Sequence, residues 1–168
     1  QRQDLPRAAG RVGHPQARVK ALVTGGGGFL GQAIVRALRK RGDAVRSFSR
    51  NSHENLKAFG VQQHNGDLAD PSSVAAAVQG CEVVFHVAAK PGIWGDYAGY
   101  HQANVTGTQN VIAACRAQGV RRLVYTSSPS VVFDGRDMEG VDESVPYSVN
   151  YAARYAAHYP RTKALAEQ

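Results

Sequence analysis

A tyrosine and a lysine near the end of the chain are the residues whose types and spacing point most directly to chemistry. Tyr159 precedes Lys163 by four residues, so on a helix both side chains face the same way. A tyrosine alone is a poor acid or base at neutral pH, because its ordinary pKa is about 10. A lysine cation close by stabilises the phenolate and lowers that pKa. The pair therefore predicts a group that exchanges a proton with an oxygen of a bound molecule.

The neighbouring residues act as an internal control for this pair. Tyr151, Tyr155 and Tyr159 follow one another at intervals of four, but only Tyr159 has a lysine four residues later. Pro160 suits the first turn of a helix, which would leave Tyr159 at the helix mouth. A surface tyrosine and lysine with no catalytic role would share the spacing, so the pair needs a second motif to support it.

A glycine-rich turn near the start of the chain is that second motif. Gly25, Gly28 and Gly31 are spaced by three residues between an apolar β-rich run and a helical pattern. The first glycine allows a tight turn, the second lets the backbone approach a pyrophosphate, and the third lets helix and strand pack closely. Free N–H groups at the helix start, around Phe29 and Leu30, then bind the phosphates. The turn predicts a dinucleotide site rather than a flexible loop.

The end of the second β-rich run bears on the choice of dinucleotide. A site that prefers NAD places an acidic residue there, about 20 residues beyond the glycines, to bond the ribose hydroxyls. Ser49 and Arg50 occupy these positions, and an arginine binds a 2′-phosphate through paired, charge-assisted hydrogen bonds. We therefore expect NADP(H), with NAD left open and a solvated Arg50 as the alternative. Asp67 and Leu68 follow the third run and are assigned to the adenine, although Asp67 could simply turn the chain.

Past residue 18, short β-rich runs alternate with helical patterns. The predicted strands are 19–24, 44–49, 61–65, 82–87 and 121–127, and the predicted helices are 28–41, 71–78, 97–118 and about 159 to the end. Strands joined by helical crossovers are parallel, and their sheet is covered on both faces. The sequence thus predicts an α/β fold, a doubly wound parallel sheet of the Rossmann type. Ligands bind this fold beyond the carboxyl ends of the strands, where each motif above lies.

Composition and charge exclude several other classes. The chain has 168 residues, 43% of them hydrophobic, and no apolar run long enough to span a membrane. Cys81 and Cys115 match no metal spacing and are expected to be buried thiols. The net charge of +7 owes much to residues 1–18, which hold four arginines and one aspartate. No basic stripe is interleaved with aromatic residues, which argues against nucleic-acid binding.

Residues 1–18 are expected to form a disordered basic extension, since they lack hydrophobic periodicity and any signal-peptide pattern. Residues 19–168 are then the nucleotide-binding domain. With no targeting signal, the cytoplasm is the default location. No metal is expected as a cofactor, and a homodimer of the full-length protein is left open.

Several segments together resemble one family. They are, in chain order, residues 24–31, 66–68, 86–89, 104–108, 125–133 and 159–163. The chain is similar to extended short-chain dehydrogenases/reductases, and within them to the 3β-hydroxysteroid and sterol dehydrogenase branch. Bacterial members with a similar segment at 94–97 include reductases of 2-alkyl-3-oxoalkanoates. The resemblance covers residues 19–168.

The resemblance implies a catalytic set of Ser128, Tyr159 and Lys163. Ser128 would hold the same substrate oxygen as Tyr159, and Lys163 would also bond the nicotinamide ribose, so both helix residues count as cofactor contacts. Asn104 would support the geometry of the active-site helix.

The resemblance also implies that Ala88 and Ala89 line the nicotinamide ribose. Lys90, next to them, is included in the cofactor site, with a substrate carboxylate or a solvated loop position as alternatives. His86 ends an apolar strand and is expected to be packed rather than catalytic.

These residues predict an NADP-dependent oxidoreductase that interconverts a secondary alcohol and a ketone on a small apolar substrate, such as a 3β-hydroxysteroid or a long-chain β-keto acid. One alternative is a nucleotide-sugar epimerase or dehydratase, which Arg50 and Pro129 disfavour. Another is a non-catalytic NADP-binding regulator, which has no need of the catalytic set. Enzymes of this branch are roughly twice as long, so we expect residues 19–168 to be an incomplete domain without the substrate-binding part, and inactive alone.

Overall fold

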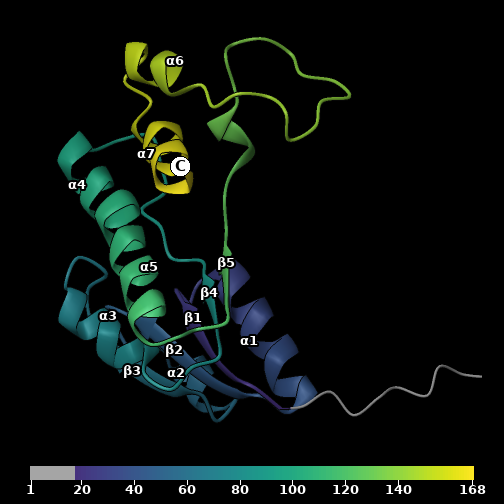
Figure 1. Cartoon of the computed structure of the whole chain (residues 1–168), viewed down its shortest axis with the longest axis vertical. Helices are drawn as coiled ribbons and strands as arrows, with labels where there is room; N and C mark the ends of the chain where they lie inside the picture. The colour runs from purple at the N-terminus through teal and green to yellow at the C-terminus, as the bar shows by residue number, and fades with distance from the viewer. Residues whose placement is uncertain (1–17) are drawn as a thin grey trace, which may run out of the picture.

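The computed structural model describes residues 18–168, so the predicted basic extension lies outside the described residues except for Arg18. The described chain forms a five-stranded parallel sheet in the order β3-β2-β1-β4-β5, with helices on both faces (Figure 1). The strands are β1 Lys20–Thr24, β2 Ala44–Ser49, β3 Gln62–Asn65, β4 Val83–His86 and β5 Arg122–Tyr125. This order confirms the predicted doubly wound Rossmann sheet.

The helices follow the predicted alternation and add short elements to it. They are α1 Phe29–Arg41, α2 Glu54–Lys57, α3 Pro71–Val78, α4 Tyr97–His101, the π-helical turn η1 Gln102–Thr106, α5 Gly107–Ala117, the 3₁₀ turn η2 Pro129–Val131, α6 Val149–Arg154 and α7 His158–Glu167. The sequence did not predict α2, η2 or α6, because elements of so few residues carry little hydrophobic periodicity.

Two hydrophobic cores form because successive strand residues point to opposite faces of the sheet. Leu22 of β1 packs with Phe48 and Val84 on the face covered by α3 and α5. Its neighbours Ala21 and Val23 pack on the other face, against α1 and α2. Full burial of one such Val, Leu or Phe side chain stabilises the fold by about 1.5–3 kcal/mol. The two cores together hold the carboxyl ends of the strands along one edge.

The two cysteines lie in the core on the α3 and α5 side, and both are free. Burial raises the pKa of the Cys115 thiol to about 11 and also raises that of Cys81. Both side chains are therefore protonated thiols near neutral pH, as the sequence predicted.

The prediction of one continuous α-helix over 97–118 is wrong in one respect. The π-helical turn η1 interrupts the α-helical hydrogen bonding between α4 and α5. The wider turn contains Asn104, whose carboxamide is buried and bonds the backbone of Lys90. The Asn104 Oδ1 atom accepts from the Lys90 N–H at 2.7 Å, and Nδ2 donates to the Lys90 carbonyl at 3.2 Å. Single π turns are rare and often occur at functional sites.

Within residues 18–168, no helix combines the length and apolar character needed to cross a bilayer. The same residues contain no group of three or more His, Cys, Asp or Glu side chains placed to hold a metal ion.

Candidate active site

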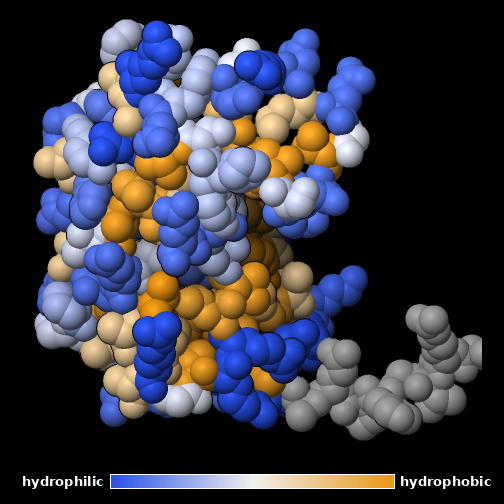
Figure 2. All heavy atoms as spheres, turned by 45° about the horizontal axis from the view of Figure 1, so that its top comes forward, coloured by the Kyte–Doolittle hydropathy of each residue, from blue (hydrophilic) through white to orange (hydrophobic). Residues whose placement is uncertain are grey.

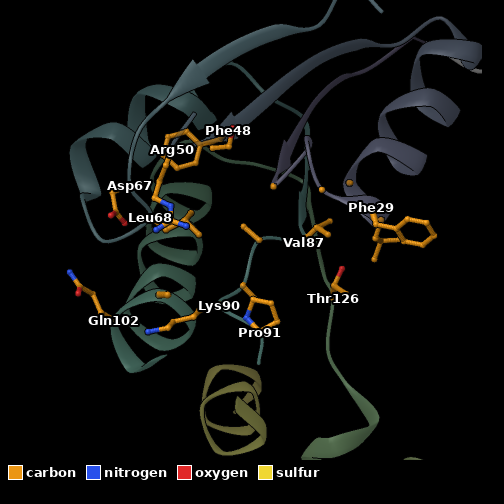
Figure 3. A pocket seen from close by; sticks show the side chains of 18 of the residues that line it. Phe29, Phe48, Arg50, Asp67, Leu68, Val87, Lys90, Pro91, Gln102 and Thr126 are labelled. Carbon is orange, nitrogen blue, oxygen red and sulfur yellow. The ribbon is translucent and has the colours of Figure 1, made fainter. Parts of the chain in front are cut away.

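A cleft of about 720 Å³ runs along the carboxyl edge of the sheet (Figure 3). Figure 2 shows one face of the molecule, on which apolar side chains gather around a hollow near the middle. The predicted site residues that line the cleft are Gly25, Gly28, Phe29, Leu30, Gly31, Ser49, Arg50, Asp67, Leu68, Ala88, Ala89, Lys90 and Tyr159. The cleft-lining residues that were not among the predicted site residues are Phe48, Gly66, Val87, Pro91, Gly99, Gln102, Ala103 and Thr126.

The glycine turn closes tightly on itself at one side of this cleft. Gly25 has a φ of +68°, in the left-handed region that favours glycine. Its carbonyl oxygen accepts from the Gly28 N–H at 2.9 Å. A Cβ on Gly31 would lie 2.1 Å from the same oxygen, so only glycine fits there. Every step of the turn therefore depends on the absence of a side chain.

Arg50, Asp67 and Leu68 lie at the end of the cleft opposite Phe29 and Thr126 (Figure 3). Arg50 comes directly after β2 and its side chain is exposed. The Asp67 Oδ1 atom accepts from the Ala69 N–H at 2.9 Å, which stabilises a turn. The chain-turning role that the sequence left open for Asp67 is therefore present, and its contact with adenine stays a prediction.

The segment after β4 is fastened at both of its ends. The Thr24 hydroxyl accepts from the N–H groups of Val87 and Ala88, both at 3.1 Å. The Lys90 backbone is held by the side chain of Asn104 in η1. The Lys90 ammonium lies 4.7 Å from the centre of the Tyr100 ring, which is a cation–π contact rather than a freely solvated position.

The two helix residues of the predicted catalytic set take different positions. Tyr159 is half-buried and lines the cleft. Lys163, one turn later on α7, is only 3% exposed, and its Nζ donates to the Thr126 carbonyl at 2.6 Å. The same atom lies 3.9 Å from the centre of the Tyr125 ring. Burial lowers the pKa of Lys163 to about 8, so its amine is still mostly in the cationic form at pH 7.

Ser128 is not among the residues that line the cleft. It caps η2, where its Oγ is 2.8 Å from the Ser130 Oγ and accepts from the Ser130 N–H at 3.3 Å. The structure thus brings Tyr159 to the cleft and bonds Lys163 to the Thr126 carbonyl, whereas the Ser128 hydroxyl is bonded to Ser130 in η2. The holding role of Thr126 was missed because it uses a backbone carbonyl, which any residue type would provide.

A side-chain hydrogen bond joins α7 to the π-helical turn. Asn104 Nδ2 donates to the buried Thr162 hydroxyl at 3.0 Å. The Thr162 hydroxyl in turn donates to the His158 carbonyl at 2.7 Å. Since Thr162 lies between Tyr159 and Lys163 in the sequence, this contact holds the helix turn that carries both of them.

Comparison with known proteins agrees with this architecture. A sequence profile of the 3-beta hydroxysteroid dehydrogenase/isomerase family matches residues 22–168. The chain belongs to this family. It is 55% identical over 152 residues to the 2-alkyl-3-oxoalkanoate reductase of Stenotrophomonas maltophilia, an alignment that covers 89% of the chain and 45% of that relative. It is 47% identical over 164 residues to the reductase of the same name from Shewanella oneidensis, covering 98% of the chain and 40% of the relative.

A solved structure with the same fold is a short-chain dehydrogenase/reductase superfamily protein from Agrobacterium tumefaciens with bound NAD. The TM-score is 0.75 at 33% sequence identity, and the match covers 88% of this chain and 43% of that one. The chain therefore spans less than half the length of these family relatives.

Proposed function

We propose that the protein is an NADP-dependent oxidoreductase that interconverts a ketone and a secondary alcohol on an apolar substrate of the 2-alkyl-3-oxoalkanoate class. The observation that carries this proposal is that one cleft is lined both by the glycine turn and by Tyr159. A proton-transferring side chain therefore borders the same space as a dinucleotide-type turn. The reductases from Stenotrophomonas maltophilia and Shewanella oneidensis support the choice of substrate class.

The glycine turn fits a dinucleotide by its shape. Its three glycines leave the backbone bare where the pyrophosphate would approach, and a Cβ on Gly28 would already lie 3.3 Å from the Gly25 carbonyl oxygen. The first N–H groups of α1 have no partners within the helix and favour an anion. Gly25 to Gly31 would hold the pyrophosphate, and Ala88 and Ala89 the nicotinamide ribose.

The proposed preference for NADP over NAD is supported by the residue that follows β2. Arg50 lines the cleft directly after β2, where an acidic residue would otherwise bond the ribose hydroxyls. A guanidinium matches a 2′-phosphate with paired hydrogen bonds, whereas an acid would repel it. The Agrobacterium tumefaciens structure contains NAD, so the likeness to it does not favour NADP. The proposed preference for NADP therefore rests on Arg50.

The residues of this chain handle the proton in the proposed reaction. The bound cofactor supplies the hydride when the ketone is reduced. Tyr159 gives its hydroxyl proton to the carbonyl oxygen, so its O–H bond breaks as the alcohol O–H bond forms, and its electron pair stays on the phenolate. The Lys163 cation, one helical turn from Tyr159 and bonded to the Thr126 carbonyl, would stabilise that phenolate. In the oxidative direction the phenolate takes the proton back.

Apolar side chains around the cleft suit an apolar substrate. Phe29 lines the cleft and is 99% exposed, and Leu30 beside it is 44% exposed. Ile93 and Trp94 follow the cleft residue Pro91 and are also largely exposed. Burial of such side chains against an alkyl chain contributes about 25 cal/mol for each Å² of apolar surface removed from water.

The test is an assay of NADPH oxidation by the full-length protein with three substrates: a 2-alkyl-3-oxoalkanoate, a 3-ketosteroid and a nucleotide sugar. We expect turnover with the oxoalkanoate and little with the nucleotide sugar. An epimerase or dehydratase returns its cofactor to the starting redox state in each turnover. Conversion of the nucleotide sugar, detected by product analysis without net NADPH oxidation, would therefore replace the proposal by one of these activities. NADPH binding without turnover of any ketone would point to a non-catalytic regulator.

A further inference from the structure

His86 ends β4 and has a fully bonded side chain in the centre of the fold, with 1% of its surface exposed. Its Nδ1 atom lies 2.8 Å from the Thr24 hydroxyl at the end of β1. Its Nε2 atom lies 3.0 Å from the Thr108 hydroxyl in α5. The imidazole therefore bridges the strand that precedes the glycine turn and the helix that follows the π-helical turn.

The tautomer of His86 follows from the other bonds of its partners. A hydroxyl has one proton and two lone pairs. Two backbone N–H groups already donate to the Thr24 hydroxyl, so its own proton points to Nδ1 of His86. The neutral ring then carries its proton on Nε2 and donates it to Thr108. The Thr108 hydroxyl donates onward to the Asn104 carbonyl at 2.6 Å.

This chain of bonds joins the two sides of the cleft. At one end, Thr24 holds the N–H groups of Val87 and Ala88, which line the cleft. At the other end, Asn104 holds the Thr162 hydroxyl on α7, the helix of Tyr159 and Lys163. We name this series the Thr24–Asn104 relay: the side chains of Thr24, His86 and Thr108, and the carbonyl of Asn104.

We propose that His86 is a positioning residue, whose imidazole, protonated on Nε2, sets the spacing between the glycine turn and the helix that carries Tyr159 and Lys163. The role rests on the proposed oxidoreductase function. It assigns His86 no contact with the reacting atoms, since the ring is buried and does not line the cleft.

The environment of His86 keeps the ring in the state that the relay needs. Burial, together with the Lys163 cation, lowers its pKa to about 3, so the ring is neutral at pH 7. The Tyr125 ring lies 5.7 Å from the His86 ring, centre to centre, and also faces the Lys163 ammonium. A packed apolar residue in place of His86 would leave the Thr24 and Thr108 hydroxyls without their central partner, which costs more than the loss of packing alone.

The first experiment reads the relay directly, without any turnover. Nitrogen NMR of histidine-labelled, full-length protein with NADPH should show His86 with its proton on Nε2 and a bare Nδ1, unchanged from about pH 5.5 to pH 8. Thr108→Val removes the acceptor for Nε2–H at nearly constant volume and should shift that nitrogen, whereas Thr108→Ser should leave it in place. A proton on Nδ1, or a ring that titrates in this range, would overturn the assignment.

The second experiment separates positioning from packing. Thr108→Val should lower kcat about tenfold and leave the KM for NADPH within about twofold, because a displacement of the catalytic helix well below 1 Å suffices for such a loss. Thr24→Val should instead weaken NADPH binding, because Ala88 loses its anchor. Thr108→Ser and Thr24→Ser, which keep the hydroxyl, should restore each value.

The outcomes of the second experiment distinguish this proposal from the proposed function. If the unmodified protein reduces no ketone but binds NADPH, the proposed function fails, and the NADPH affinities of Thr24→Val and Thr24→Ser still test the relay. If both valine variants fold with unchanged kcat and NADPH affinity, His86 is only packed and the proposal is wrong. Thermal unfolding of each variant checks that the fold is intact.

Discussion

The two sides of the cleft are built in different ways. The proposed cofactor side consists of the glycine turn and the residues that follow β2, β3 and β4, and much of it is presented by the backbone at neighbouring strand ends. The proposed catalytic side consists of Thr126 and α7, and it is held by long-range bonds: Lys163 to the Thr126 carbonyl and Asn104 to Thr162. The glycine turn depends on local sequence, whereas the position of α7 depends on contacts between residues far apart in the chain.

The largest expected effect comes from Tyr159→Phe, which should disable the catalytic side and leave the cofactor side intact. The substitution keeps the ring that borders the cleft but removes the proton donor. Loss of a positioned general acid lowers turnover by roughly 10²- to 10⁴-fold. NADPH affinity, measured by fluorescence titration of the full-length protein, should stay within about twofold.

The matched control is Tyr155→Phe. Tyr155 is 60% exposed, lies four residues earlier directly after α6, and has no lysine four residues later. Removal of the Tyr155 hydroxyl should leave kcat unchanged, because Tyr155 does not line the cleft. A Tyr159→Phe protein with near-normal kcat would mean that another group transfers the proton.

Arg50→Ala should affect the opposite side of the cleft. If the guanidinium binds a 2′-phosphate, its removal costs about 1.5–3 kcal/mol of NADPH binding, or roughly 10- to 150-fold in Kd. NADH binding should barely change, so the preference for NADPH disappears. Lys57→Ala removes a positive charge on α2 that does not line the cleft, and it serves as the control for general electrostatics. Equal affinities for NADPH and NADH in the unmodified protein would contradict the assignment.

Gly31→Ala tests whether the cofactor side depends on backbone shape alone. The added Cβ would lie 2.1 Å from the Gly25 carbonyl oxygen, so the turn has to move away from α1. Overpacking of this kind costs about 1–3 kcal/mol, which corresponds to roughly 5- to 150-fold weaker NADPH binding. Lys40→Ala, an exposed position of the same helix, should bind NADPH normally. Unchanged affinity in Gly31→Ala would show that the turn can relax without loss.

The same contrast explains how much could be predicted from sequence. Periodicity and spacing within a few residues predict the strands, the glycine turn and the position of Arg50. Sequence analysis therefore located the strands, and it placed the glycine turn and Arg50 at their carboxyl ends, as the structure does. Long-range bonds leave no such pattern. The Lys163 contact with the Thr126 carbonyl and the Asn104 contact with Thr162 join segments that are 37 and 58 residues apart.

Buried polar residues were the hardest to interpret from sequence. Arg46 lies in a buried strand because its guanidinium donates to the carbonyls of Ala76, Ala77 and Gln79 at the end of α3. His86 was correctly expected to be packed, but its two hydroxyl partners lie on other elements. In both cases a polar side chain is buried among apolar residues, which is unfavourable unless it is hydrogen-bonded. Its hydrogen-bond partners come from other parts of the chain and are seen only in the structure.

The smallest expected effect concerns His86, which connects the two sides, and it appears in the pH dependence of stability. The pKa of His86 is about 3 in the folded protein and 6.5 ordinarily, so the unfolded chain takes up a proton at this site below about pH 6.5 while the folded protein does not. Stability from the neutral ring is therefore complete above that pH and falls as the pH drops towards 3. Between about pH 7 and pH 5.5 the loss is about 1 kcal/mol.

The measurement is the free energy of unfolding by denaturant at both pH values, for the full-length protein and for His86→Gln. The variant should lose about 1 kcal/mol less on acidification, because glutamine does not titrate. The charged and titratable groups that face His86, Lys163 of α7 and Tyr125 of β5, are the same in both proteins. Burial raises the pKa of Tyr125 and leaves that of Lys163 at about 8, so neither changes charge appreciably between these pH values. Equal losses in the two proteins would mean that His86 is protonated in the folded state, and the relay would then lack the bare Nδ1 that Thr24 requires.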